Sequence, residues 1–173
     1  MTPANRKEAM QLLVDIGAPF RLVRHAELVG EAADALLSGF ARLEVPLDAH
    51  YVRVGAVLHD VGKAVHHAEL DAPGSSHELA GENLLLGRGA SPDVARLCRS
   101  HAQWLDLAET LEELVGALAD KLWKGARVTE LEELVVDRAA ASVRKDRWQL
   151  FTPLDALFEQ VASEADARLA RSA

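Results

Sequence analysis

Cysteine, aromatic residues and long apolar runs are all scarce in this chain. Cys98 is the only cysteine among 173 residues, which excludes internal disulfide bonds and zinc sites built from several thiolates. No apolar run approaches the roughly 18 residues of a membrane-spanning helix, and the N-terminus lacks the apolar region of a secretory signal. We therefore expect a cytoplasmic protein with no membrane partner.

Basic residues are too few to balance the acidic ones, and the formal net charge is −8. That charge repels polyanions, so we expect no nucleic-acid partner. A small anionic substrate is still allowed, because a bound metal ion can dominate the local field. Hydrophobic residues make up 49% of the chain, enough for one core. We expect a single domain over residues 1–173, with its core in 19–127 and helices of 128–173 packed on that core; the oligomeric state is not predicted.

Helix-forming residues dominate, and no run alternates in the manner of a strand, so the pattern predicts an all-α fold. Asp48 is a good N-cap, and Ser91-Pro92 and Thr152-Pro153 mark two further helix starts with proline in the first turn. Residues 63–76 are predicted to form one long irregular loop, a kind of segment that is often functional. The expected helices cover residues 5–16, 19–43, 48–62, 77–87, 92–104, 109–124, 129–147 and 153–170.

An adjacent histidine and aspartate, His59-Asp60, interrupt an apolar helical segment that runs from Val52 to Val61. Burying an imidazole and a carboxylate together is costly unless each is paired or bound to a metal. Neighbouring helical residues point about 100° apart, so both can grip one ion only near a helix end, where Gly62 places them. The two oxygens of Asp60 suit it to bridge two cations.

Four further residues of ligand type lie on separate predicted segments: His25, His77, His101 and Asp120. His25 and His101 lie on apolar helix faces, where a hydrogen-bonded core histidine is the competing interpretation. His77 begins a helix and is equally explained as a first-turn residue. Asp120 lies off the apolar stripe of its helix, so periodicity alone does not place it inside the protein.

The ordered series of His25, His59-Asp60, His77, His101 and Asp120, with His-Asp-Val-Gly-Lys at its centre, resembles the HD superfamily of metal-dependent phosphohydrolases. This resemblance implies an all-helical bundle with a metal centre between its helices. By similarity to the two-metal branch, one ion would be held by His25, His59, Asp60 and Asp120, and a second by Asp60, His77 and His101. Nitrogen and oxygen donors without thiolate suit one or two divalent ions of iron, manganese, cobalt, nickel or zinc.

The same resemblance implies hydrolysis of a small phosphorylated compound, with a nucleotide or dinucleotide favoured, by a metal-bridging hydroxide. Asp60 would then be catalytic, and Lys63 would neutralise charge on the transferring group. The predicted substrate-binding residues are Lys63, His66, Lys121 and Lys124. Their competing interpretations are a cation at a helix end for Lys63 and solvated surface residues for the others.

Two other functions stay open. A minority branch of the superfamily uses the same ligands to hold two irons and cleaves carbon–carbon or carbon–phosphorus bonds with dioxygen. The third possibility is a non-catalytic helical module whose metal is structural or absent.

Overall fold

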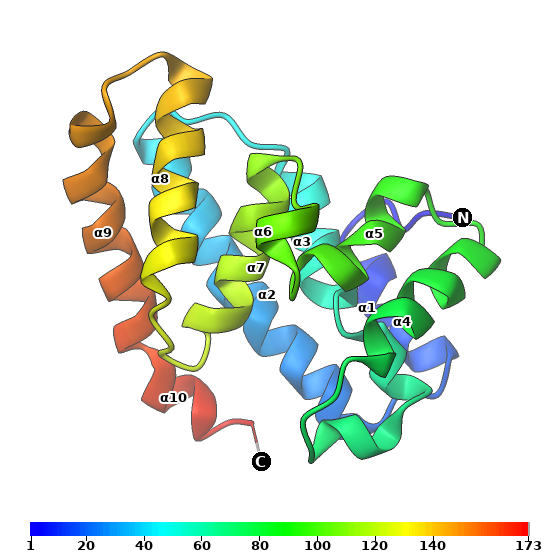
Figure 1. The fold of residues 1–173 in the computed structure, drawn as a ribbon. Helices are drawn as coiled ribbons and strands as arrows, with labels where there is room; N and C mark the ends of the chain where they lie inside the picture. The colour runs from blue at the N-terminus through cyan, green and yellow to red at the C-terminus, as the bar shows by residue number, and fades with distance from the viewer. Residues whose placement is uncertain (173) are drawn as a thin grey trace.

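A computed structural model describes residues 1–172, which form helices joined by turns and contain no strand, so the all-α prediction is confirmed (Figure 1). Over these residues, no helix has both the length and the hydropathy needed to cross a membrane. The α-helices are α1 (Arg6–Asp15), α2 (Phe20–Arg42), α3 (Ala49–Leu58), α4 (Ser76–Gly87), α5 (Pro92–Ser100), α6 (Trp104–Leu107), α7 (Leu111–Leu122), α8 (Thr129–Val143), α9 (Arg147–Ser163) and α10 (Ala165–Leu169). Two 3-10 helices, η1 (Val61–Ala64) and η2 (His67–Leu70), lie between α3 and α4.

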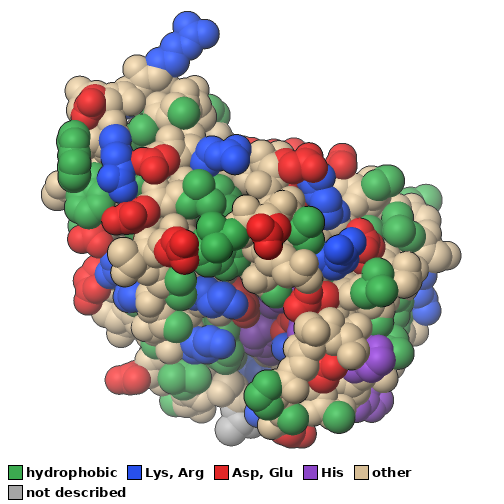
Figure 2. All heavy atoms as spheres, in the orientation of Figure 1, with side chains coloured by type: hydrophobic (Ala, Val, Ile, Leu, Met, Phe, Trp, Pro, Cys, Tyr) green, Lys and Arg blue, Asp and Glu red, His purple; other side chains and the backbone are tan. Residues whose placement is uncertain are grey.

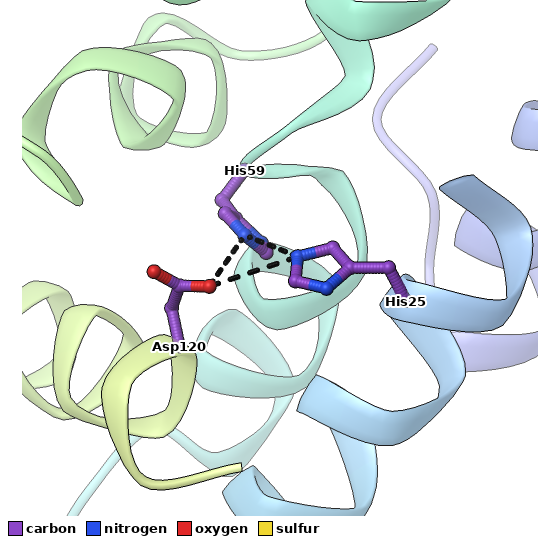
Figure 3. A group of neighbouring side chains, drawn as sticks. All are labelled: His25, His59 and Asp120. Atoms are coloured by element: carbon purple, nitrogen blue, oxygen red, sulfur yellow. Dashed lines mark hydrogen bonds and ion pairs between the residues drawn. The ribbon is translucent and has the colours of Figure 1, made fainter. Parts of the chain in front are cut away.

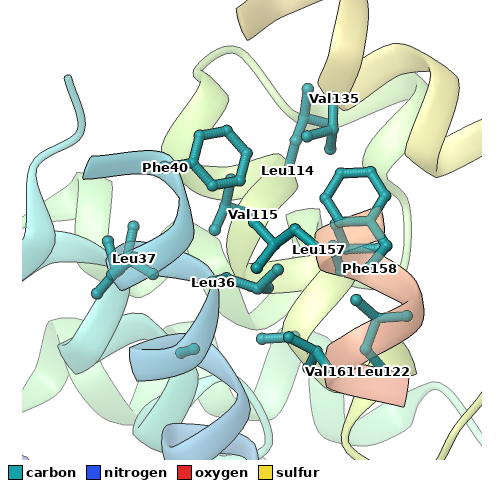
Figure 4. Close-up of a cluster of buried hydrophobic side chains, with 14 of the residues drawn as sticks. Leu36, Leu37, Phe40, Leu114, Val115, Leu122, Val135, Leu157, Phe158 and Val161 are labelled. Atoms are coloured by element: carbon teal, nitrogen blue, oxygen red, sulfur yellow. The ribbon is translucent and has the colours of Figure 1, made fainter. Parts of the chain in front are cut away.

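The interior consists of two apolar clusters, and α2 and α3 contribute to both. The larger cluster joins α2 and α3 to α7, α8 and α9, and includes the fully buried Phe40, Leu114 and Phe158 (Figure 4). The smaller one joins α3 to α1, η1, α4 and α5 around Leu13 and Leu85. Each large side chain buried in this way contributes about 1.5–3 kcal/mol. Because α2, α3 and α7 pack on one another, their ends meet at the boundary between the clusters.

Local capping explains where the helices at this boundary begin. The carboxylate of Asp48 accepts hydrogen bonds from the backbone N–H groups of His50 and Tyr51 at 3.0 and 3.1 Å, as expected for the N-cap of α3. α7 starts with a capping box in which Thr110 and Glu113 each bond the backbone of the other. These caps fix the residue at which α3 and α7 each begin. They therefore help determine which side chains of the two helices face the boundary between the two apolar clusters.

The helix predicted over residues 48–62 is wrong at its C-terminal end, because α3 stops at Leu58. Asp60 has φ −102° and ψ 11°, and the chain then tightens into η1. The cause is a long-range contact: a Cβ on Gly62 would lie 1.9 Å from the carbonyl oxygen of His77, so the chain passes directly against α4 here. Residues 63–76 are likewise not irregular throughout, since they contain part of η1 and all of η2.

The helix predicted over residues 92–104 is also too long, because α5 ends at Ser100 and α6 follows a turn. Pro92 does occupy the first turn of α5, as predicted. The turn is tied by Gln103, whose side-chain amide donates a hydrogen bond to the buried carboxylate of Glu78 on α4. A hydrogen bond of this kind between two segments does not change the apolar periodicity of either, so the sequence pattern does not predict it.

The predicted helix start at Thr152-Pro153 is wrong. Asp146 forms a capping box with Gln149, so α9 begins at Arg147 and Pro153 lies inside it. The predicted helix over 129–147 correspondingly ends early at Val143, where Arg144 takes the left-handed conformation with φ 54°. The two-sided cap at Asp146 satisfies more backbone groups than a lone hydroxyl would, which explains the earlier start.

Candidate metal centre

The side chains of His25, His59 and Asp120 point toward one another from three different parts of the bundle (Figure 3). His25 comes from α2, His59 follows the last residue of α3, and Asp120 comes from α7. His25 Nε2 lies 3.3 Å from His59 Nε2 and 3.6 Å from Asp120 Oδ1, and His59 Nε2 lies 3.4 Å from Asp120 Oδ1. Donors bonded to one divalent ion at about 2.1 Å are themselves separated by about 3.0–3.5 Å. This spacing therefore fits a single metal ion.

Asp60 connects this group to a second pair of histidines. Its Oδ2 atom lies 3.3 Å from His25 Nε2 and 3.6 Å from His59 Nε2. Its Oδ1 atom lies 3.1 Å from His77 Nε2 and 3.6 Å from His101 Nε2. The two oxygens of one carboxylate thus face two different sets of imidazoles. The donor atoms of His59, Asp60 and His101 also lie within 4.8 Å of one another, so His59 can contribute to either set.

All six residues that the sequence singled out as ligands are therefore brought together, and they are buried apart from His25 at the outer edge. Two of their atoms, Asp60 Oδ1 and His77 Nε2, are fully buried and have no hydrogen-bond partner. An unsatisfied buried polar atom costs about 1–3 kcal/mol. A cation between the two atoms would remove that cost, so the donor set fits a divalent metal bound by nitrogen and oxygen.

The electrostatics of the group keep Asp60, Asp120 and His101 in the protonation states that metal ligands require. Burial alone would raise the pKa of Asp60 and of Asp120, but the surrounding imidazoles, with His59 foremost, hold both well below the usual range. Burial lowers the pKa of His101 to about 3, so its ring is neutral at pH 7. Burial also disfavours charge on His59, yet the two carboxylates outweigh it and raise its pKa. Ionised carboxylates and a neutral imidazole are ready to bind a cation.

Two lysines supply positive charge next to the carboxylates. Lys63 Nζ lies 2.6 Å from Asp60 Oδ2, and Lys121 Nζ lies 2.8 Å from Asp120 Oδ2. Both lysine side chains are about a quarter exposed or less, so each pair is partly shielded from water. Lys63 lies in the last turn of η1 and also pairs with a carboxylate of the centre, so both interpretations of this residue fit the structure.

A cavity of about 680 Å³ opens directly beside the centre. Figure 2 shows histidine side chains inside a hollow, with Lys or Arg side chains close by. Among the described residues, neither His66 nor Lys121 lines this cavity, so their predicted contact with substrate gains no support. Its lining combines two of the candidate ligands, three cations and mostly apolar residues: His25, Asp60, Arg21, Lys63, Lys124, Phe20, Leu22, Leu70, Trp123, Leu169 and Ser172.

The last described residues form one wall of the cavity through Leu169 and Ser172. This segment is held on α2 by Arg171, whose guanidinium bonds both carboxylate oxygens of Glu31 at 2.9 and 2.6 Å. Arg24 adds a bond of 2.6 Å to the backbone carbonyl of Arg171. The wall is thus tied to the same helix that carries His25.

Sequence reasoning missed two residues near the centre. Arg21 lines the cavity and lies one helical turn before His25, a spacing that would have identified it. Glu69 accepts a hydrogen bond of 2.6 Å from His77 Nδ1, which lowers the pKa of its carboxyl group to about 2. No spacing rule links a loop carboxylate to a histidine in the following helix, so the sequence held no signal for Glu69.

Comparison with known proteins places this site in a family. Residues 20–141 match a family model described as HD domain. A tRNA (cytidine(56)-2'-O)-methyltransferase of Thermoplasma volcanium is 28% identical over 73% of the chain, which covers 38% of that protein. Ribonuclease Y of Acidothermus cellulolyticus and of Thermotoga maritima are 34% and 36% identical over 58% of the chain, which covers 20% of each. The chain therefore spans well under half the length of these relatives. No solved structure matches it.

Proposed function

The chain belongs to the HD-domain family, and on that premise we propose that it is a metal-dependent phosphohydrolase acting on a small phosphorylated compound. The observation that carries the proposal is Asp60, whose two oxygens face two separate sets of imidazoles at the floor of a cavity lined with cations. Relatives named ribonuclease Y add support for phosphate-ester hydrolysis as the reaction class. The metal would be iron, manganese, cobalt, nickel or zinc, with one or two ions per chain.

The residues of the centre would have different roles. His25, His59 and Asp120 would hold one divalent ion, His77 and His101 a second, and Asp60 would serve both. When bound, such ions polarise a phosphate group and lower the pKa of water. The protein itself contributes the neutral imidazole of His101, the ionised carboxylates of Asp60 and Asp120, and a fixed arrangement of donors, so little reorganisation is needed when charge develops.

The cavity next to the centre favours a substrate that has an anionic group and an apolar or planar group. Lys63, Lys124 and Arg21 would hold an anionic group near the metals. Phe20 and Trp123 also line the cavity and would contact an apolar or planar group. A volume of about 680 Å³ is in the range of small-molecule sites. A nucleotide has both groups and this size, and we propose it as the substrate class.

A long nucleic acid is a poorer candidate, because the net charge of −8 opposes binding of a polyanion beyond the cavity. The substrate preference can be tested directly. Metal-free protein is reloaded with each candidate metal, and the products formed from nucleoside monophosphates, dinucleoside polyphosphates, phenyl phosphate and a short RNA are separated and quantified by chromatography. Asp120→Ala should abolish hydrolysis and lower metal content, whereas Glu130→Ala, an exposed carboxylate on α8, should change neither.

Each result has a defined meaning. Faster hydrolysis of a nucleotide or dinucleotide than of phenyl phosphate supports the proposal. Hydrolysis of RNA alone would replace the substrate class. No hydrolysis with any metal, together with substrate-dependent oxygen consumption by the iron form, would overturn the hydrolase and favour the oxygenase.

A further inference from the structure

The imidazole of His77 lies between two carboxylates. Its Nε2 atom is 3.1 Å from Asp60 Oδ1, and its Nδ1 atom is 2.6 Å from Oε2 of Glu69, a residue of η2. The Glu69 side chain is 13% exposed, so this contact is largely shielded from water. A carboxylate that accepts a hydrogen bond from Nδ1–H fixes the tautomer and leaves Nε2 unprotonated, with its lone pair available to a metal.

Glu69 holds the backbone of His77 as well as its ring. The same carboxylate accepts hydrogen bonds from the backbone N–H groups of Ser76 and His77, both at 3.1 Å. These groups lie in the first turn of α4, where the helix itself provides no acceptors. The loop also closes tightly around the carboxylate, since a Cβ on Gly74 would lie 2.4 Å from the Glu69 side chain.

The other buried imidazoles of the centre are oriented differently. His59 Nδ1 is 3.0 Å from the carbonyl oxygen of Ala56, and His101 Nδ1 is 3.2 Å from that of Leu97. Both acceptors belong to the preceding turn of the same helix. His77 has no preceding turn, because α4 begins at Ser76. An acceptor from outside the helix has to orient its ring, and Glu69 is in that position.

We propose that Glu69 is a positioning residue for the second metal site: it holds His77 in the tautomer and orientation in which Nε2 binds a metal shared with Asp60. This inference rests on the two-metal form of the proposed function. Glu69 itself does not touch the metal or the substrate, and it acts through His77.

The test is a titration of metal-free protein with Co²⁺, followed by visible absorption and by elemental analysis of the separated protein. The parent should bind two equivalents. Glu69→Ala should weaken the second equivalent about 10–100-fold, the usual loss when an outer partner of a ligand is removed, and leave the first unchanged. Glu69→Gln should weaken binding of the second equivalent less than Glu69→Ala does, because its amide oxygen can still accept a hydrogen bond from His77 Nδ1. Asp71→Ala, a control from the same loop that pairs with Arg21, should bind like the parent.

A double-mutant cycle separates positioning of His77 from support of the loop. In a His77→Ala background, Glu69→Ala should cause no further loss of Co²⁺ binding. A further loss there, equal weakening of both equivalents, or a second equivalent bound as tightly as in the parent would each overturn the proposal. A parent that binds one equivalent overturns it together with the two-metal centre. A parent that binds two equivalents but hydrolyses no phosphate ester overturns the proposed function, and the assignment of Glu69 is still decided by the titration.

Discussion

Replacing Gly62 with alanine would place a methyl group inside the backbone of α4. The added Cβ would lie 1.9 Å from the carbonyl oxygen of His77 and 2.6 Å from the backbone nitrogen of Gly81. Gly62 does not have a left-handed φ, so close approach, and not conformation, is what requires glycine here. Both neighbours are backbone atoms and cannot rotate away, which forces α4 and η1 to separate.

The structure sets the size of the effect. Reaching an ordinary van der Waals distance requires a shift of about 1.5 Å, which is about half of the 3.1 Å between His77 Nε2 and Asp60 Oδ1. Overpacking of this kind costs about 1–3 kcal/mol. For a domain of this size, that corresponds to a fall in Tm of about 3–10 °C. We also expect the second metal equivalent to be lost, because His77 moves with α4.

The measurement uses metal-free protein for the Tm, from circular dichroism, and a Co²⁺ titration for the metal sites. Gly116→Ala is the matched control, since a Cβ there meets no atom within 4 Å and lies in the interior of α7. That variant should gain about 0.5–1 kcal/mol from reduced chain entropy and bind metal normally. A Gly62→Ala protein that matches the parent in Tm and still binds two equivalents would refute the reasoning.

Three further predictions use the same preparation. Asp60→Ala should lose both metals and all turnover, because its oxygens face both sets of imidazoles; retention of metal and near-normal turnover in elemental and kinetic assays would contradict this. Lys63→Ala should lower kcat/KM by about 10²–10³-fold without reducing metal content, whereas a lower Tm with an unchanged rate would return Lys63 to a structural role. Burial raises the pKa of the Cys98 thiol, so a thiol reagent such as dithionitrobenzoate should label it only after unfolding, and rapid labelling of native protein at pH 7 would contradict its burial.

Local patterns were sufficient to predict the fold class and most helix positions. Apolar periodicity located α2 and α7, and a single capping residue, Asp48, located the start of α3. The predicted helix bounds were wrong where the structure depends on more than the local apolar pattern. The end of α3 depends on how closely Gly62 approaches α4, and the start of α9 depends on which of two competing caps satisfies more backbone groups.

The residues of the candidate site were also predictable only in part from local patterns. His25 and His101 lie on apolar faces that periodicity identifies, but Asp120 was placed only by the family resemblance. The structure shows why: Asp120 reaches the centre at the buried boundary between two apolar clusters, a geometry that no single helix encodes. Glu69 could not be predicted at all, because its partner lies across a turn whose path the sequence does not specify.

The centre joins segments that are far apart in the chain, from His25 on α2 to Asp120 on α7, at the boundary between two apolar clusters. A cation bound by both residues would bind the folded chain and not the unfolded one, so it would stabilise the fold by mass action. Metal present at 100 times its Kd would add about 2.7 kcal/mol to the free energy of unfolding. Resistance of the chain to proteases would then depend on metal supply, and the amount of folded protein would follow the available metal as well as the rate of synthesis.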